Sequence, residues 1–146
     1  MYKIVGCLFL IFAMTLFFYR RCIKFYCTCR YVGYILKLLD DMKIACMYGK
    51  TYKPVFESFE RQVENDLFFK ICFAFCSEKI KYETDSILIN SGKRIKEDEE
   101  IYLEYNKKIL KDKYTEYMTK FKENNKISLL MGFYVAVVII LLIVEE

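Results

Sequence analysis

The strongest constraint on this chain is a pair of uncharged, apolar runs, one at each end. The first extends from Ile4 to Tyr19 and the second from Ile127 to Val144. A bilayer core offers no water to backbone N–H and C=O groups, so such runs cross it as helices. About twenty residues at about 1.5 Å each match a hydrocarbon core of about 30 Å. The second run therefore predicts a transmembrane helix.

The first run is shorter and has to be weighed against a cleaved secretory signal. A signal peptide ends in small residues at its cleavage site. This run instead ends in Leu-Phe-Phe-Tyr-Arg-Arg at positions 16–21. The sequence therefore favours an N-terminal anchor that stays attached to the protein.

Basic residues flank the inner side of both runs, and lysine and arginine next to a span tend to remain in the cytoplasm. They are Arg20, Arg21, Lys24 and Arg30 after the first run, and Lys113, Lys120, Lys122 and Lys126 before the second. We therefore expect a two-pass protein of the cell membrane with both termini outside. The expected domains are an anchor at 1–19, a cytoplasmic domain at 20–126, and a span at 127–146 that ends in a short acidic tail.

The charge of the chain indicates lipids rather than nucleic acid as a partner. The net charge is +4, and the basic excess lies mainly between Arg20 and Lys50. Anionic lipids of the inner leaflet attract such segments. No motif that reads a groove or stacks on bases accompanies the charge, so no nucleic-acid partner is expected.

The seven cysteines occur without any histidine. The pairs Cys27-x-Cys29 and Cys72-x-x-x-Cys76 do not repeat the ligand spacing of a zinc site, and cytosolic thiols stay reduced. We therefore expect small buried apolar side chains and no metal. The acidic run Glu97–Glu100 is interpreted as a solvated helix start, because adjacent residues point to different sides of a helix.

The sequence also favours a protein without catalysis or cofactor. The chain lacks histidine, a glycine-rich phosphate loop and a Gly-x-Ser-x-Gly turn. Enzymes that transfer protons, phosphoryl groups and acyl groups commonly depend on these features. A membrane-tethered enzyme is therefore the weakest of the function classes considered.

Between the two runs, apolar residues recur at helical spacing and predict an all-α, antiparallel helical bundle flanked by the two transmembrane helices. A first stripe ends at Gly49, a left-handed stop, and a second follows Pro54, which suits the opening turn of a helix. The stripes are Val32, Ile35, Leu39, Met42 and Cys46, and then Val55, Phe56, Phe59 and Val63.

A third helix is expected after a cap at Asn65-Asp66, with an apolar stripe rich in phenylalanine. Its members are Leu67, Phe68, Ile71, Cys72, Phe75 and Ile80. We expect a break at Thr84-Asp85 and then a brief helical piece that Ser91-Gly92 ends.

The last helix is expected from about Glu97, and neither Pro nor Gly interrupts it before Gly132. Its stripe consists of Leu103, Leu110, Tyr114, Tyr117 and Phe121. We expect this helix, and the one that contains Val32, to run without a break into the apolar runs. The rings of Phe59, Phe75 and Phe121 are expected in the core.

Several short segments resemble the stage III sporulation protein AB family of endospore-forming bacteria. Tyr48-Gly49 with Thr51 and Pro54 resembles that family's Tyr-Gly-x-Thr-Pro turn. The stretch 88–98, Leu-Ile-Asn-Ser-Gly-Lys-Arg-Ile-Lys-Glu-Asp, resembles its Leu-Gly-Lys-x-Leu-Gly-x-x-Asp segment. The opening Lys-Ile-Val-Gly at 3–6 and the Leu-Leu-Met-Gly-Phe-Tyr-Val of the second run also fit.

The resemblance implies a non-enzymatic part of the sporulation channel complex in the mother-cell membrane around the forespore. It also implies a cytosolic domain similar to those of type II secretion F and pilus platform proteins. The implied partners are a secretion-type ATPase like sporulation protein AA and other channel subunits, and a homo-oligomer is a further expectation. The alternative is a small viral or phage membrane protein that acts through helix association in the bilayer.

An adaptor of this kind is expected to bind its partner through the turns farthest from the membrane. Those turns, around 48–54 and 91–98, bring together basic side chains and the acidic start of the last helix, a mixed-charge surface suited to steering a partner. The candidate partner-binding residues are Lys50, Lys53, Lys93, Lys96, Glu97 and Asp98. Ordinary solvated turns remain the alternative interpretation, because turns are polar for local reasons.

Overall fold

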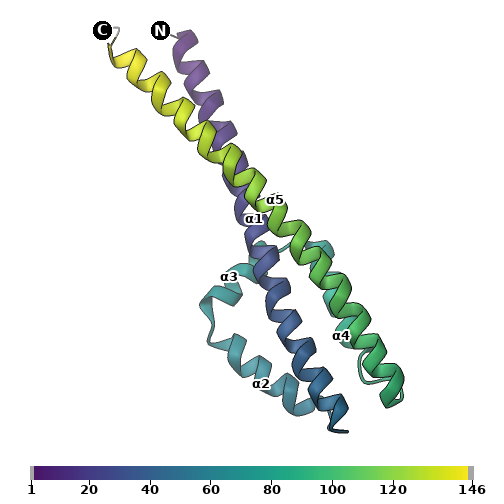
Figure 1. Ribbon diagram of the computed structural model, residues 1–146. Helices are drawn as coiled ribbons and strands as arrows, with labels where there is room; N and C mark the ends of the chain where they lie inside the picture. Colours follow the sequence, from purple (N-terminus) through teal and green to yellow (C-terminus); the bar gives the residue numbers. More distant parts are fainter. Residues whose placement is uncertain (1, 145–146) are drawn as a thin grey trace. The chain divides into compact units, whose positions relative to one another are not determined.

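A computed structural model describes the backbone of residues 2–144 and, apart from residues 2–4, 7, 140 and 142–144, their side chains. The described chain is all-helical, with five helices (Figure 1). They are α1 (Tyr2–Met47), α2 (Lys53–Glu64), α3 (Leu67–Phe75), α4 (Glu78–Asn90) and α5 (Lys96–Val144). The all-α prediction is confirmed, and so is the expectation that each apolar run continues as one helix into the middle of the chain.

The helices form two compact units. The end unit consists of Met1–Ile23 and Thr119–Glu146, and the middle unit of Lys24–Met118. The acidic tail expected at Glu145 and Glu146 lies outside the described residues.

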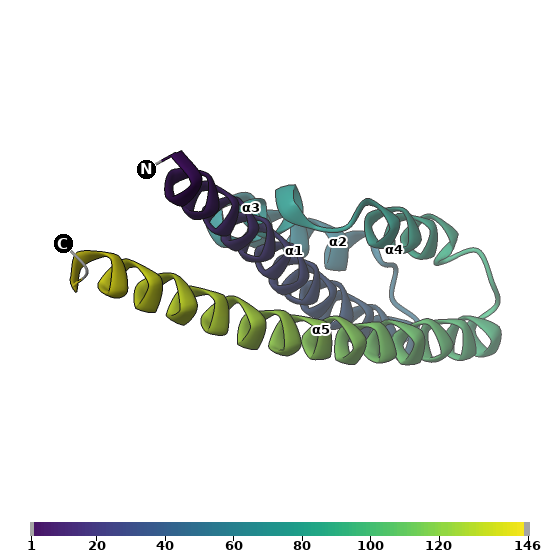
Figure 2. The same cartoon turned by 90° about the horizontal axis from the view of Figure 1, so that it is seen from above.

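In the middle unit, α1 and α5 run antiparallel. Lys107 Nζ lies 2.6 Å from Asp40 Oδ1, while farther back along α1 the Cys29 thiol lies 3.4 Å from the carbonyl oxygen of Tyr114. A later residue of α1 therefore contacts an earlier residue of α5, which is the antiparallel arrangement. Figure 1 shows α2 and α3 beside α1, and α4 beside α5; Figure 2 gives a second view of the same helices.

The core of the middle unit lies where the apolar stripes of α1, α4 and α5 meet. Its most completely buried members are Val32, Ile35, Leu38, Leu39 and Met42 of α1, Ile80 of α4, and Leu103 and Leu110 of α5. The α1 stripe and the two leucines of α5 were predicted from their spacing, and both predictions are confirmed. The six described sulfhydryls, all except that of Cys7, are free, and their predicted burial is confirmed.

The expected third helix is wrong in its bounds. The helix breaks at Cys76 and Ser77, which are both extended, and α4 then runs through Thr84 and Asp85. The break occurs where the Ser77 N–H donates to the Thr28 hydroxyl of α1 at 3.0 Å. Thr84 does not end a helix, because its buried hydroxyl bonds to the Lys81 carbonyl oxygen and to the Tyr31 hydroxyl.

The phenylalanine stripe of α3 is also corrected. Cys72 and Ile80 are buried as expected, but Phe75 is 50% exposed and Leu67 72% exposed. Phe59 is half-buried and packs against the core, and Phe121 is half-buried in the end unit. Most of the predicted stripe of α3 therefore faces outward.

The end unit pairs the start of α1 with the end of α5. The Cys22 thiol lies 3.8 Å from the carbonyl oxygen of Phe121, and large apolar side chains of both helices are exposed. Over the part of the chain that the structure describes, none of the helices combines the length and the apolar character that a membrane crossing requires.

Candidate functional site

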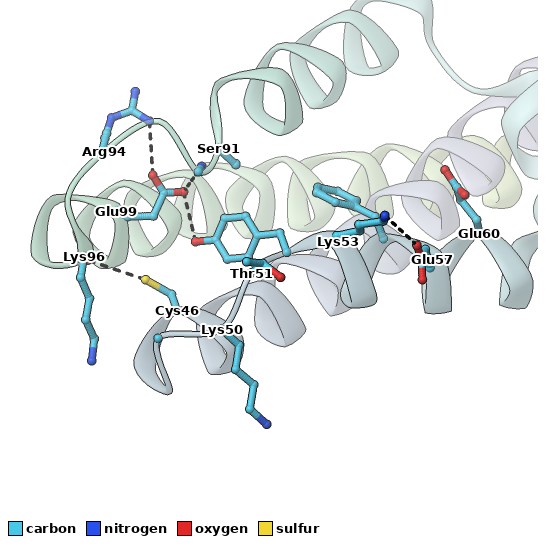
Figure 3. A pocket seen from close by; sticks show the side chains of 14 residues that line it. Cys46, Lys50, Thr51, Lys53, Glu57, Glu60, Ser91, Arg94, Lys96 and Glu99 are labelled. Carbon is cyan, nitrogen blue, oxygen red and sulfur yellow. Dashed lines mark hydrogen bonds and ion pairs between the residues drawn. The ribbon is translucent and has the colours of Figure 1, made fainter.

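The two turns singled out in the sequence meet in the middle unit and form a pocket of about 740 Å³ (Figure 3). One wall comes from the α1–α2 turn and the first turns of α2, and the other from the α4–α5 turn and the start of α5. The lining residues with polar or charged side chains are Cys46, Lys50, Thr51, Tyr52, Lys53, Glu57, Glu60, Ser91, Arg94, Lys96 and Glu99.

Glycines in left-handed conformations shape both turns. Gly49, at φ 63°, ends α1, and the Lys50 N–H donates to the Ala45 carbonyl oxygen at 2.8 Å. The Gly49 N–H donates to the Cys46 carbonyl oxygen at 3.0 Å, so the two bonds form a Schellman motif. In the other turn Gly92 has φ 79°, a conformation that residues with a β-carbon rarely adopt. Both turns therefore depend on the left-handed backbone that glycine allows.

A buried carboxylate, that of Glu99, joins the two walls. It is 2% exposed, although it belongs to the first turn of α5. Its Oε1 accepts the Gly92 N–H at 2.8 Å and the Tyr52 hydroxyl at 3.2 Å. Its Oε2 lies 3.7 Å from Arg94 Nη1 and accepts no hydrogen bond. The expectation of a fully solvated acidic run is therefore wrong at this position.

The side chains around Glu99 are held by further contacts. The Arg94 guanidinium donates to the Asn90 carbonyl oxygen at 2.7 Å and lies 3.7 Å from the centre of the Tyr102 ring. Burial, followed by hydrogen bonding to Cys46 and the charge of Glu99, raises the pKa of Tyr52 far above its ordinary value. Tyr52 therefore stays protonated and acts as a donor.

Three of the six predicted partner-binding residues line the pocket: Lys50, Lys53 and Lys96. Lys96 has a structural contact as well, since its Nζ donates to the Met47 carbonyl oxygen at 2.7 Å. Lys53 Nζ lies 3.9 Å from Glu57 Oε1.

The other three predicted residues, Lys93, Glu97 and Asp98, are exposed in the same turn and helix start but do not line the pocket. The Lys93 ammonium donates to Asn90 Oδ1 at 3.3 Å. The structure thus brings the lysines of the α1–α2 turn to the α4–α5 turn, and leaves the two acidic residues on the outer side of α5.

Sequence reasoning missed Tyr52, Arg94 and Glu99. Gly92 and Glu99 are seven residues apart, farther than the three residues that separate the partners of a capping box, so their hydrogen bond has no standard sequence signal. The contact with Tyr52 crosses 47 residues of sequence and has no local signal.

Chemically, the pocket offers a rim of lysine ammonium groups with acidic side chains on the α2 wall. Such a surface suits a charged segment of another protein. Among the described residues, no three histidine, cysteine, aspartate or glutamate side chains come together as ligands for a metal ion.

Comparison of the chain with protein-family models, curated proteins and solved structures found no match.

Proposed function

We propose that this chain is a non-enzymatic, integral component of the cell membrane that acts as an adaptor between a cytosolic ATPase and membrane subunits. By its resemblance to the stage III sporulation protein AB family, the complex would be a sporulation channel of the secretion type. Its location would be the mother-cell membrane around the forespore, with the middle unit in the cytoplasm.

The observation that carries the proposal is the apolar surface of the end unit. In water a helix pair hides its apolar side chains between its members, whereas here they point outward on both helices. Phe9 is 73% exposed and Leu10 67%, and on α5 Leu129 is 67% and Phe133 66% exposed. The full runs from Ile4 to Tyr19 and from Ile127 to Val144 carry no charge. Lipid is the solvent that such surfaces fit.

The continuity of the helices supports an adaptor. α1 and α5 contain the apolar runs and also build the core of the middle unit. Within the middle unit, α1 extends from Lys24 to Met47, which is about 35 Å at about 1.5 Å per residue. The pocket lies at the end of this stretch, so α1 connects a partner bound there to the first apolar run.

The proposed partner surface is a lysine rim that consists of Lys50 and Lys53 at the pocket and of Lys93 in the adjacent α4–α5 turn. A secretion-type ATPase like sporulation protein AA is the proposed partner. The exposed apolar faces of the end unit would contact other channel subunits or further copies of this chain. Mixed charges around a partly enclosed pocket favour a specific protein partner over a general anion.

The test is crosslinked capture of the ATPase from sporulating cells that express the full chain. A variant with Lys50→Glu, Lys53→Glu and Lys93→Glu should lose capture and block sporulation while membrane insertion and helicity persist. Lys96 is left intact because it caps the carbonyl of Met47. The matched control carries the same charge change at Lys79, Lys108 and Lys111, which are exposed away from the pocket.

Undiminished capture by the first variant would exclude the rim as the docking site. Capture of no ATPase by the unmodified chain would refute the adaptor itself.

The second candidate is a small viral or phage membrane protein that acts through helix association in the bilayer. It is favoured by Gly6 and Gly132, around which a β-carbon would meet nothing within 4 Å. Small residues on open faces let membrane helices approach closely. Self-crosslinking through the end unit without ATPase capture would support this function instead.

A further inference from the structure

The short helix α3 differs from the rest of the middle unit in its surface. Its sequence, Leu-Phe-Phe-Lys-Ile-Cys-Phe-Ala-Phe, contains one charged residue, Lys70. In a globular unit such a helix is normally buried on all sides. Here one side is buried and the opposite side is open.

The buried side of α3 fixes it against α1. The Phe69 ring lies 5.0 Å from the Tyr34 ring and 6.0 Å from the Tyr31 ring, centre to centre, and Cys72 is fully buried. Asp66 caps the helix by accepting the Phe69 N–H at 3.1 Å, and it also accepts the Tyr34 hydroxyl at 2.6 Å. The orientation of α3 is therefore set by both packing and a polar anchor.

The open side is consequently held outward. It consists of Leu67, Phe68, Ile71 and Phe75, which follow helical spacing and are 72%, 42%, 44% and 50% exposed. A contiguous patch of large apolar side chains on a soluble surface marks a binding surface. We refer to these four residues as the α3 face.

The charge of the surrounding chain indicates what covers this face. The first acidic residue of the chain is Asp40, and the part of α1 in the middle unit that precedes it contains Lys24, Arg30 and Lys37. The α3 face continues from this basic segment, because the Phe68 ring lies 6.4 Å from the Tyr26 ring of α1. Aromatic and aliphatic side chains beside basic ones are the composition of a helix that lies in a lipid interface.

We propose that the α3 face inserts into the headgroup region of an anionic membrane, with Lys70 and the basic segment of α1 contacting lipid phosphates. This inference rests on the proposed membrane insertion of the apolar runs. A second protein is a poorer occupant, because stable protein interfaces bury about 800 Å² on each partner, which four side chains on two turns do not provide.

The natural chain contains no tryptophan, so a single substituted tryptophan reports its own surroundings. The full chain with Phe75→Trp would be reconstituted in vesicles of phosphatidylcholine and phosphatidylglycerol that contain lipid brominated near the headgroup. Phe133→Trp reports insertion of the second run, and Tyr82→Trp, on α4 at a residue that is 77% exposed, reports a position in water.

The expected result is quenching of Phe75→Trp to at least about half the extent seen at Phe133→Trp, as suits a depth of about 5 to 10 Å, and none at Tyr82→Trp. Adding Lys70→Glu to Phe75→Trp should reduce that quenching.

Quenching at Phe133→Trp alone would overturn the proposal and leave the membrane insertion standing. An absence of quenching at both phenylalanine sites would refute the insertion as well. If the tryptophan emission of Phe75→Trp were blue-shifted but unquenched, and the variant crosslinked to a second copy of the chain, the α3 face would be assigned to self-association.

Discussion

Removing the buried carboxylate of Glu99 should open the pocket and destabilise the middle unit. The carboxylate accepts two hydrogen bonds, and bonds to charged groups contribute about 1.5 to 3 kcal/mol each. Gly92 is exposed, so water can replace part of what its N–H loses, whereas the Tyr52 hydroxyl is half-buried. We therefore expect Glu99→Ala to lower the free energy of unfolding by about 2 to 4 kcal/mol.

The variant Glu99→Gln separates charge from shape. Its amide oxygen can still accept from Gly92 and Tyr52, but its amide nitrogen would face Arg94, which is held by Asn90 and Tyr102. A loss of about 1 to 2 kcal/mol is expected. The matched control is Glu97→Gln, which removes a charge from the same helical turn at an exposed position and should cost less than about 0.5 kcal/mol.

Urea unfolding of the full chain in detergent, followed by the tyrosine signal in near-ultraviolet circular dichroism, measures these differences. Amide hydrogen exchange at Gly92 supplies a local readout, because its N–H loses its acceptor only in Glu99→Ala. If Glu99→Ala were as stable as the Glu97→Gln control and left exchange at Gly92 unchanged, the role assigned to the carboxylate would be refuted.

Three further predictions concern packing and pH. Ile80→Ala should destabilise the middle unit by about 2 to 5 kcal/mol, and Phe75→Ala by less than about 1 kcal/mol because half of that ring is exposed; equal losses in urea unfolding would contradict the packing. Thr84→Val should cost about 1 to 2 kcal/mol by leaving the Tyr31 hydroxyl without its 3.0 Å partner, and Tyr31→Phe should remove most of that cost in a double-mutant cycle. The hydrogen bond to Asp66 raises the pKa of Tyr34 from 10.0 to about 12, so its contribution to stability is complete below pH 10.0 and is lost as the pH rises through about 12. Asp66→Asn should return the Tyr34 ionisation, followed as tyrosinate absorbance against a Tyr34→Phe background, toward its ordinary value.

The helical framework could be predicted from local patterns. Apolar side chains that repeat every three or four residues bury one helix face wherever a partner is available, so their spacing alone assigns Val32, Met42 and Leu103 to the core, where they are buried. Gly49 was predicted to end its helix, because glycine adopts the left-handed conformation without a β-carbon penalty. Ser91-Gly92 was likewise predicted to end a helix, so both turns that bound the pocket were available from sequence.

The errors lie where a distant residue changes the local preference. The sequence from Leu67 to Ile80 reads as one helix, yet the chain breaks at Ser77, whose N–H bonds to Thr28, 49 residues away. Thr84 is a residue type that often occurs at helix ends, and a break was expected there. It is instead buried in α4, because Tyr31 of α1 supplies a partner for its hydroxyl.

What the sequence determined by itself was the periodicity of the helices, the uncharged runs at both ends and the position of the glycine turns, since each depends on neighbours a few residues apart. Only the tertiary structure decided which face of α3 turns outward and that Glu99 turns inward. Those choices depend on the rings of α1 that cover Phe69 and on the Tyr52 hydroxyl that reaches Glu99, and such contacts join residues tens of positions apart. Periodicity marks a face as apolar or acidic, but the partner that covers it is selected by the packing of the whole unit.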